Sequence, residues 1–561
     1  MKKRILAMTL TLVMIVALAA CGGNQSGGTN TSAPAPVGSE TPNTGETDAG
    51  GTTGPKEITV AMTTSMGDMD PFTYSSPGRN NLRYFVYEYL AMFKEFGTPW
   101  QDMEWVVAKN IEQVDDTTYQ IEIYDYVVDA IGNPITASDV AFCVNSMKDN
   151  GNWTRLTRYV ESCSAVEDYV VEIKLTSSTV GVIEYVMCQT PIISEKTYTE
   201  NQSTMNTTPI TTAAYQITEC VSGSYYTIEK NENYWQTDEN LRSVFAQQPV
   251  DKMTYQIITE GNQATIALQM GEVDLITSVK AAELGYFINP DGTPVEGYSV
   301  ASSMSTQGGK LCFNMAEGAE GDIFRDNLPL RQAICYAIDA QAIVDIALGG
   351  QGEPAHDPAP RICGDFNDEW MEEDYYGYDL EKARSLLAEA GYEGGIDPAT
   401  GAPLHLRLLC DSTRKDMAVV IQAQLIEAGL DVEILAMDDA MFSDYQYDPT
   451  RWDLAINKQG TEAYISNVYD GILLQNSDGI GAKCFVVDEE LEELLVAAHD
   501  VTTHSEESVE ALHDYVKENA LLYGLYDDYV YSVGREGIEV FQHPWNVLVP
   551  NACTYADGYF G

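Results

Sequence analysis

The stretch from Phe324 to Leu348 constrains the fold most, because its apolar residues follow the repeat of an α-helix. Asp339 interrupts this pattern, and a second short helix is predicted from Ala342 to Leu348, ending at Gly349-Gly350. The pattern by itself predicts two short helices packed against a core. The first helix carries one apolar stripe, made of Leu330, Ala333, Ile334, Ala337 and Ile338.

The N-terminus predicts export and lipidation. A basic segment, Lys2 to Arg4, precedes an apolar run from Ile5 to Ala17, and residues 18–21 read Leu-Ala-Ala-Cys, which is a lipobox. We therefore expect residues 1–20 to be removed as a signal peptide and Cys21 to be lipidated. The apolar run is too short for a stable membrane span, so we expect a soluble body held by its acylated N-terminus.

Residues 21–55 are predicted to be the lipidated cysteine and a disordered tether. They contain no aromatic residue and few aliphatic ones among Gly, Ser, Thr, Pro and Asn, so they cannot bury enough surface to offset the cost of ordering. A flexible coil of this length spans about 30 Å. This arrangement favours the outer face of a Gram-positive cell membrane, or the periplasmic side in a Gram-negative cell.

The charge excludes several classes of partner. The formal net charge is −54, from 31 Lys and Arg and 85 Asp and Glu residues, and it becomes −57 when the three basic residues of the signal peptide are lost. Phosphate backbones and anionic lipids would repel such a surface, so nucleic-acid binding and electrostatic membrane association are disfavoured. With 44% apolar residues, the chain has ample core for two or three domains.

The ten cysteines beyond Cys21 are scattered without a C-x-x-C pair. An exported protein could join them in disulfides, but the spacing indicates no framework. Buried free thiols are an equal alternative.

The rest of the chain alternates between predicted strands and helices. Thr136 and Asp139 have the spacing of a capping box at the start of a helix. From Asp379 onward, two similar units each contain a helix that ends at glycine and then a strand, which predicts an α/β sheet layer. Earlier, strands are predicted at residues 58–62, 119–124, 169–175 and 273–276, and a helix at 82–93.

Several of these segments resemble family 5 solute-binding proteins, the extracytoplasmic receptors of peptide and nickel ABC importers. Arg331 to Asp339 is similar to the family's "D-x-x-V-R-x-A-I-x-x-A-I-D-R-x-x-I" segment. Thr136 to Val140 matches "T-A-E-D-V", and Ala267 to Asp274 nearly matches "A-L-Q-S-G-E-V-D". The blocks follow in the family's order between Glu57 and Ile538, although Pro209 to Tyr215 has lost both glycines of "P-x-G-T-G-P-Y".

The resemblance implies an α/β fold with two lobes joined by crossing strands and the ligand enclosed between them. This is the two-lobed periplasmic-binding-protein-like fold, type II, in the large cluster C form with an extra subdomain in the first lobe. The expected division places lobe I at 56–78, 206–305 and 515–561, the extra subdomain at 79–205 and lobe II at 306–514.

One loop carries the main ligand residues that the resemblance implies. In peptide-binding members, a segment like "D-L-A-L-x-G-W-x-x-D-Y-P-D-P" follows a strand, and its Asp after the Trp holds the ligand's α-ammonium. Here Asp453 to Ile456 supplies the strand, Gln459 replaces the Trp, and Glu462 stands at the Asp position. A buried carboxylate is costly unless paired, and a bound ammonium would be such a partner. Glu462 is therefore the candidate amine anchor, with a solvated loop carboxylate as the alternative.

Other candidates come from neighbouring segments. Arg414 lies in the loop where some dipeptide-binding members hold the ligand carboxylate, and arginine suits a bidentate clamp, although a surface position is the alternative. Backbone groups near Ser65 and Met66, and near Gly460, would pair with an extended ligand as an added strand. Two further candidates are Tyr464, expected to line the cleft, and Asn314, in the segment that crosses into the second lobe.

An enzymatic reading has little support. The sequence contains no G-x-S-x-G, H-E-x-x-H, P-loop or G-x-G-x-x-G motif. His499, His504 and His513 lie in a helical stretch but miss the i, i+4 spacing of a metal pair. We therefore expect no catalytic residue, no cofactor and no metal site.

These observations predict a lipid-anchored receptor that captures oligopeptides or dipeptides in a cleft and delivers them, as a monomer, to an ABC permease. Binding would favour the closed state that the permease recognises. Two alternatives remain. The same fold could carry nickel, a metal chelate or another non-peptide solute, or the chain could be a sensory or adhesive surface protein that does not close on a small solute.

Overall fold

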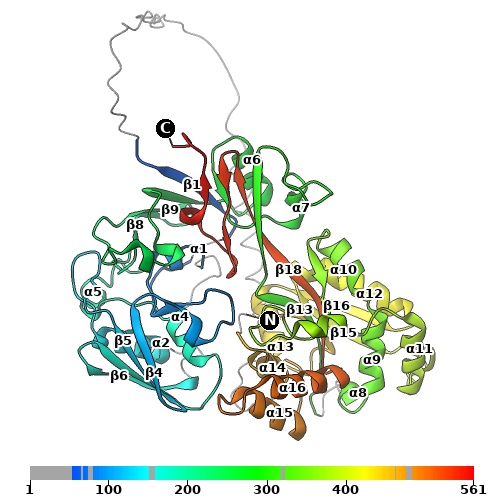
Figure 1. Cartoon of the computed structure of the whole chain (residues 1–561). Coiled ribbons are helices and arrows are strands. Elements are labelled where there is room, and N and C mark those ends of the chain that lie inside the picture. The colour runs from blue at the N-terminus through cyan, green and yellow to red at the C-terminus, as the bar shows by residue number, and fades with distance from the viewer. Residues whose placement is uncertain are drawn as a thin grey trace, which may run out of the picture. The chain divides into compact units, whose positions relative to one another are not determined.

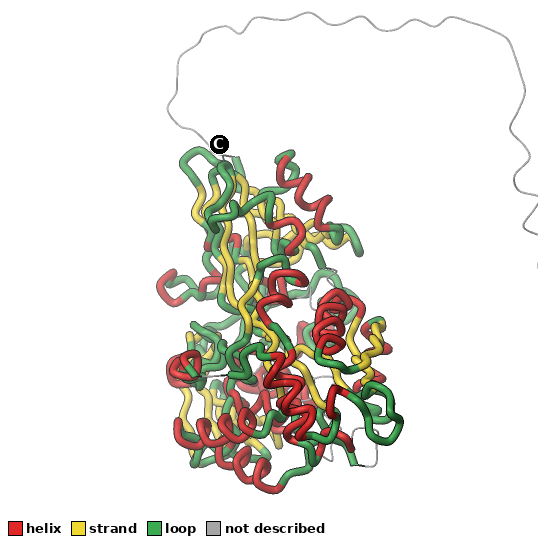
Figure 2. Tube along the Cα trace, turned by 90° about the vertical axis from the view of Figure 1, so that its right-hand side faces the viewer, coloured by secondary structure: helices red, strands yellow, loops and turns green. Residues whose placement is uncertain are grey.

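The computed structural model describes residues 54–560, and Figures 1 and 2 show it in two views. The described residues form one compact unit, and the predicted signal peptide and the predicted tether up to residue 53 lie outside them. None of the helices in the described part of the chain is long and apolar enough to cross a membrane. The description omits seven internal segments, at residues 65–66, 74–79, 151–157, 318–321, 374, 461–462 and 475–482.

Strand β18, Leu522–Arg535, joins the two halves of the main sheet (Figure 1). Its first part pairs with β13, Gln307–Phe313, and its second part pairs with β12, Tyr298–Met304. The strands form a band with helices on its sides (Figure 2). In spatial order the sheet contains β16 (Asp431–Met437), β15 (His405–Asp411), β17 (Leu454–Gly460), β13, β18, β11 (Leu275–Ile276), β1 (Glu57–Met62), β10 (Lys252–Ile257), β9 (Tyr225–Lys230) and β8 (Tyr215–Val221), with β14 (Gly352–Pro354) also paired to β18.

A second sheet of four antiparallel strands shares a hydrophobic core with β1, β8, β9 and β10. Helix α2, Ala137–Asn150, packs on it through Val140, Val144 and Met147. We call this sheet, with α2, α4 (Val182–Gln189) and α5 (Glu195–Glu200), the small subdomain. Its strands are β4 (Ala108–Asp115), β5 (Thr118–Ile123), β7 (Val170–Leu175) and β6 (Val160–Glu167).

Another core lies around β13, β15 and β17, and we call the part built on it lobe II. This core runs from Leu311 to Tyr526 and includes residues 516–526, which the sequence placed in lobe I. The predicted domain boundaries, including the one at residue 514, stay predictions. The helices of lobe II are α8 (Asp322–Arg325), α9 (Leu328–Ala337), α10 (Ala340–Ala347), α11 (Leu380–Glu389), α12 (Lys415–Glu427), α13 (Asp439–Gln446), α14 (Ile465–Ile472), α15 (Glu489–His499) and α16 (Glu506–Glu518).

The remaining elements are short. A small cluster of buried residues packs α6 and α7 against the main sheet. The start and end of the body lie together, because Lys56 Nζ is 5.9 Å from the ring centre of Phe560. These elements are α1 (Asn80–Val86), α6 (Gly261–Gln269), α7 (Ala281–Leu284), and the strand pairs β2 (Ala91–Met92) with β3 (Glu104–Trp105), β19 (Ile538–Glu539) with β22 (Thr554–Tyr555), and β20 (Gln542–His543) with β21 (Val547–Leu548).

The two helices predicted from the apolar stripe are present as α9 and α10. Asp339 separates them because it caps α10, and its Oδ1 accepts a hydrogen bond from the Ala342 N–H at 3.1 Å. Gly349 and Gly350 follow α10 with φ of +58° and +78°, a region that favours glycine.

Replacing Asp339 by alanine is expected to lower the free energy of unfolding by about 1 kcal/mol, because the first turn of α10 loses its cap. Urea denaturation followed by circular dichroism measures this change. Asp345→Ala, on the exposed face of the same helix, is the matched control. Equal losses for both variants would show that the cap contributes nothing beyond the helix surface.

The helix predicted at residues 82–93 ends early, at Val86. In the second half of the predicted helix, the backbone bonds to a distant segment instead. Ile192 N–H donates to the Glu88 carbonyl at 2.8 Å, and Leu90 N–H donates to the Met187 carbonyl at 3.1 Å. The capping box is half formed, since Asp139 Oδ2 accepts from the Thr136 N–H at 2.8 Å.

The structure distinguishes between disulfides and free thiols for the cysteines among the described residues. All ten cysteines after Cys21 are free thiols, and all except the half-buried Cys220 are buried. Burial raises the pKa of Cys410 and of Cys553 to about 11. These thiols therefore act as small apolar side chains in the cores.

Candidate functional site

Lobe II joins the rest of the main sheet where two neighbouring chain segments pass from one core to the other. Ser305 and Thr306 connect β12 to β13, and Asp527 and Asp528 lie between the two parts of β18. The two segments are in contact, because Ser305 N–H donates to the Asp528 carbonyl at 2.7 Å. We call these four residues the crossing, and rotation of one lobe against the other would bend the chain there.

A buried cation lies next to the crossing. Lys310 on β13 is fully buried, and its ammonium has no hydrogen-bond partner among the described residues. Burial lowers the pKa of Lys310, and the nearby Asp527 and Asp357 oppose this effect. Burial also raises the pKa of Asp357 to about 8. The sequence analysis did not single out Lys310, although a lysine within the apolar strand GGKLCF was a visible signal.

Strand β17 ends near the crossing and has one edge that is only partly covered. β13 pairs with it over its whole length, with Gln307 opposite Gly460. On the other edge, β15 pairs only with Leu454 and Ala455. From Ile456 to Gly460, this other edge has no strand partner among the described residues, although Ile456 and Asn457 are buried. This edge includes Gln459 and Gly460, two of the predicted ligand residues.

Arg414 lies after β15, as the sequence indicated, and its guanidinium is mostly buried. It forms an ion pair with Asp411, which also caps the turn at residues 412–414. Its Nε has no hydrogen-bond partner among the residues that the structure describes. Arg414 is therefore partly buried, and its role stays a prediction. A carboxylate clamp would have to share the guanidinium with Asp411.

Asn314 lies inside lobe II. Its Nδ2 donates to the Pro449 and Trp452 carbonyls, both at 2.7 Å, and its Oδ1 accepts from the Ala316 N–H at 3.2 Å. The residue is fully buried, and these bonds hold the turn that leads into β17. This position indicates a structural role and does not support the ligand contact predicted for Asn314.

Tyr464 reaches away from lobe II and packs in the core of the small subdomain. Its hydroxyl lies 3.5 Å from Glu184 Oε1 on α4, and its ring would touch a side chain added at Gly181. Glu184 is buried, and burial raises its pKa. Tyr464 therefore links the loop after β17 to the small subdomain, and its contact with a ligand stays a prediction.

Four of the predicted site residues lie outside the described residues. They are the lipidation site Cys21, the backbone candidates Ser65 and Met66, and the amine anchor Glu462.

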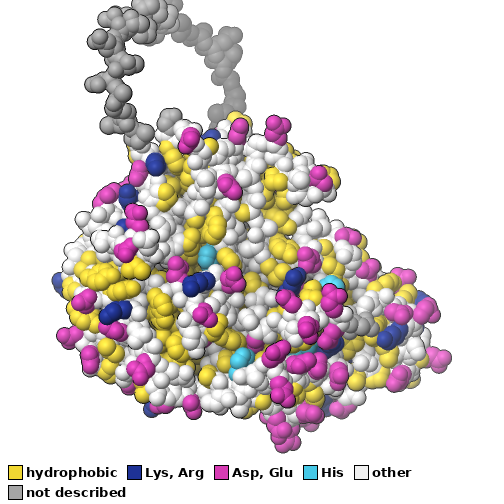
Figure 3. All heavy atoms as spheres, in the orientation of Figure 1, with side chains coloured by type: hydrophobic (Ala, Val, Ile, Leu, Met, Phe, Trp, Pro, Cys, Tyr) yellow, Lys and Arg dark blue, Asp and Glu magenta, His cyan; other side chains and the backbone are white. Residues whose placement is uncertain are grey.

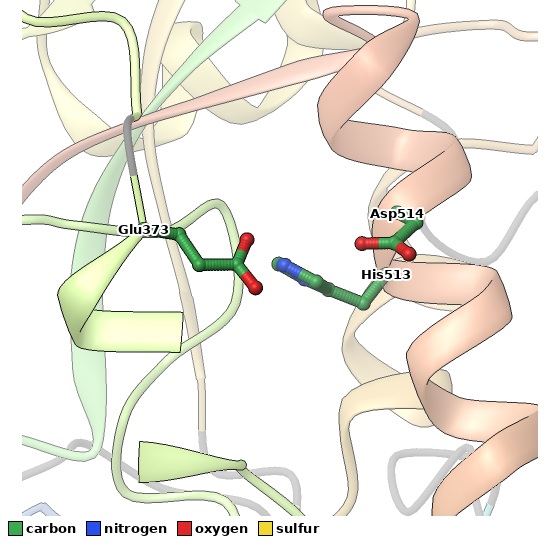
Figure 4. A group of neighbouring side chains, drawn as sticks. All are labelled: Glu373, His513 and Asp514. Atoms are coloured by element: carbon green, nitrogen blue, oxygen red, sulfur yellow. The ribbon is translucent and has the colours of Figure 1, made fainter. Parts of the chain in front are cut away.

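Glu373, His513 and Asp514 approach the geometry of a metal site, with one ligand atom from each within 4.8 Å of the others. The nitrogen end of the His513 ring points toward Glu373 (Figure 4). However, Lys517 already forms an ion pair with Glu373, and His513 Nε2 lies 3.1 Å from Asp357 Oδ2. Burial lowers the pKa of His513 to about 3, so the ring is neutral. Because Lys517 already pairs with Glu373, the arrangement does not indicate a metal centre.

The visible face of the protein carries many carboxylates and few basic groups (Figure 3). This distribution agrees with the formal net charge of −54. The face shown in Figure 3 carries no extended basic patch that would suit a polyanion.

The sequence pattern of the bacterial extracellular solute-binding proteins, family 5 (middle region), matches residues 103–477, about two thirds of the chain. The chain belongs to this family. The expectation that it is not an enzyme is thereby confirmed, because family 5 proteins bind solutes. The family also shows that this is an extracytoplasmic solute-binding protein of ABC transport, with the permease as the implied partner.

Individual relatives of this family 5 protein are named for binding different solutes. It is 24% identical over 473 residues to the nickel-binding periplasmic protein of Escherichia coli, covering 80% of this chain and 84% of the relative. It is also 24% identical over 484 residues to the oligopeptide-binding protein AppA of Bacillus subtilis, covering 81% and 79%. The structure of AppA in complex with a nonapeptide matches with a TM-score of 0.69 at 19% identity, over 90% of this chain and 100% of that chain. The last comparison confirms the predicted fold class.

Proposed function

We propose that this family 5 protein is a lipid-anchored receptor that captures oligopeptides or dipeptides between its lobes and delivers them to an ABC permease. The partly covered edge of β17 carries this proposal. Side-chain identity varies among peptides but the backbone does not, so an added strand is the expected mode of binding. Ile456 and Asn457 are buried, so the backbone groups for such a strand would come from Lys458 to Gly460, which directly precede residues 461–462 in the sequence.

Electrostatics favours an amine at the same place. The net charge attracts cations, and Glu462, two residues after Gly460 in the sequence, is the candidate carboxylate for the free N-terminus of a peptide paired to β17. The nickel-binding and oligopeptide-binding relatives are equally similar, so relatedness alone does not favour either solute. The peptide proposal rests on the strand edge and the anchor.

Native mass spectrometry tests the proposal directly. Residues 54–561 would be purified without denaturation, and whatever stays bound would be released and fragmented. A heterogeneous set of short peptides is the expected result. A single non-peptide mass, or a metal chelate, would agree with a solute receptor but would reject peptides as its ligand. An empty protein that also shows no compaction by small-angle scattering with peptide mixtures would favour a sensory or adhesive role.

Glu462→Gln is expected to weaken the binding of peptides with a free N-terminus at least fivefold, because a hydrogen bond to a charged group is lost. Isothermal titration calorimetry measures this for a free peptide and for the same peptide N-acetylated. The acetylated form has no ammonium, so its affinity is expected to change far less. Equal losses for both forms would rule out the amine anchor.

A further inference from the structure

Two glycines bring lobe II into direct contact with the segment that precedes the small subdomain. Gly97 lies in the loop between β2 and β3, and Gly364 lies in lobe II. A Cβ added to Gly364 would lie 2.2 Å from the Gly97 carbonyl oxygen, which is far inside van der Waals contact. Gly364 N–H donates to the Ala463 carbonyl at 2.9 Å. Only the absence of side chains at both positions permits this approach of the two backbones.

A second pair of segments meets in the manner of antiparallel strands. Val180 N–H, just before α4, donates to the His499 carbonyl at 2.9 Å, and Val501 N–H donates to the Ser178 carbonyl at 3.3 Å. Thr179 forms an antiparallel β-bridge with Asp500. Backbone groups of the small subdomain are thus paired by the end of α15.

Asn467 on α14 closes the arrangement. Its Nδ2 donates to the Val180 carbonyl at 3.0 Å, and its Oδ1 lies 2.7 Å from His499 Nε2. Tyr464, one turn earlier, inserts its ring beside Gly181. Asn467 therefore holds both sides of the contact through one side chain.

These contacts differ in kind from the crossing. At the crossing, β12, β13 and β18 connect the cores covalently, whereas this contact is made of hydrogen bonds, packing and one ion pair, Arg158 with Asp470 at 3.6 Å, between segments distant in the sequence. Bending at the crossing would separate it, and it would also withdraw Ala463 and Tyr464 from the core of the small subdomain. Its polar groups are mostly backbone amides and carbonyls, which water can satisfy when the surfaces part.

We propose that this is a closure contact, which forms when the lobes close over the ligand and separates when they open. It comprises Gly97 and residues 178–184 on one side, and Gly364, residues 463–467 and residues 499–501 on the other. Gly364 and Asn467 are then positioning residues, because they set ligand affinity through the fraction of closed protein and do not touch the ligand. The inference rests on the proposed function, in which ligand is held between closing lobes.

Gly364→Ala is the sharpest test, since the added methyl group blocks the contact with Gly97. The matched control is Gly377→Ala in the same lobe, where an added Cβ would meet nothing within 4 Å. Affinity and dissociation rate would be measured for a random tetrapeptide library by native mass spectrometry and competition. Gly364→Ala is expected to bind at least tenfold more weakly than the control, mostly through faster dissociation, with an unchanged melting temperature without ligand.

Asn467→Ala provides a second variant that adds no atoms, and it is expected to weaken binding in the same direction. If Gly364→Ala and Asn467→Ala both bind the library as the wild type does, the closure contact is overturned. A ligand-free melting temperature that falls by several degrees, with affinity unchanged, would instead identify a permanent interface and also overturn it.

Hydrogen exchange separates this inference from the proposed function. In ligand-free protein, the Val180 and Val501 amides, whose hydrogen bonds cross the contact, are expected to exchange much faster than core amides of β13. Protection of these two amides equal to that of the core would overturn the closure contact even if no peptide binds. Fast exchange together with no response to the library would instead reject the peptide ligand and leave the opening motion intact.

Discussion

Replacing Asp453 by alanine is expected to lower the free energy of unfolding of lobe II by about 3 kcal/mol, because it leaves a charge without its partner. Asp453 is 4% exposed at the start of β17. Its carboxylate accepts from Arg407 Nε and Nη2, both at 3.0 Å, and from the Arg407 backbone N–H at 2.7 Å. The pair fixes β15 beside β17, at the base of the strand edge proposed for the ligand.

Chemical denaturation of the wild type and of Asp453→Ala measures this loss. Asp444→Ala removes a carboxylate that is 76% exposed and lies 3.3 Å from Arg451, and it is the control for a surface ion pair. Such pairs contribute little, so a change below about 1 kcal/mol is expected there. A loss for Asp453→Ala no larger than that of the control would contradict the argument from burial.

Glu88→Gln is expected to stabilise the protein at high pH and to remove part of its pH dependence. Burial raises the pKa of Glu88 to about 7, with an opposing contribution from the Tyr234 hydroxyl, which donates to its Oε1 at 2.6 Å. The folded-state pKa is above the ordinary value of 4.5, so the protonated form is favoured in the fold. The stability from this group is full below pH 4.5 and is lost as the pH rises through 7.

The shift corresponds to about 3 kcal/mol between acidic pH and pH 8.5. Urea midpoints of the wild type and of Glu88→Gln would be compared at pH 5 and at pH 8.5, because glutamine keeps the acceptor for Tyr234 and cannot ionise. Both proteins contain the same other titrating groups, so the difference between their stabilities cancels the contributions of those groups. His543 is one of them; burial lowers its pKa to about 4, so its contribution changes with pH in the opposite direction. Glu195→Gln, exposed on α5, is the control. Parallel pH profiles for wild type and Glu88→Gln would contradict the buried-carboxylate argument.

Local signals in the sequence predicted local structure well. The apolar stripe from Leu330 to Ile338 specified α9, and Asp339 specified the break, because helical spacing and capping depend on neighbouring residues alone. The order of the family motifs likewise identified the fold, since it reflects the whole succession of elements. The helix predicted at 82–93 was wrong in its second half, where Glu88 and Leu90 pair with residues about a hundred positions away.

The sequence by itself thus determined the charge, the helices and strands that rest on local periodicity, and membership of the family. Only the tertiary structure decided which side chains are available. Asn314 is occupied by the turn before β17, Arg414 is paired with Asp411, and Tyr464 is packed against the small subdomain. The physical reason is that availability depends on hydrogen bonds and packing between segments far apart in the chain, and no local pattern encodes which distant group arrives beside a given side chain.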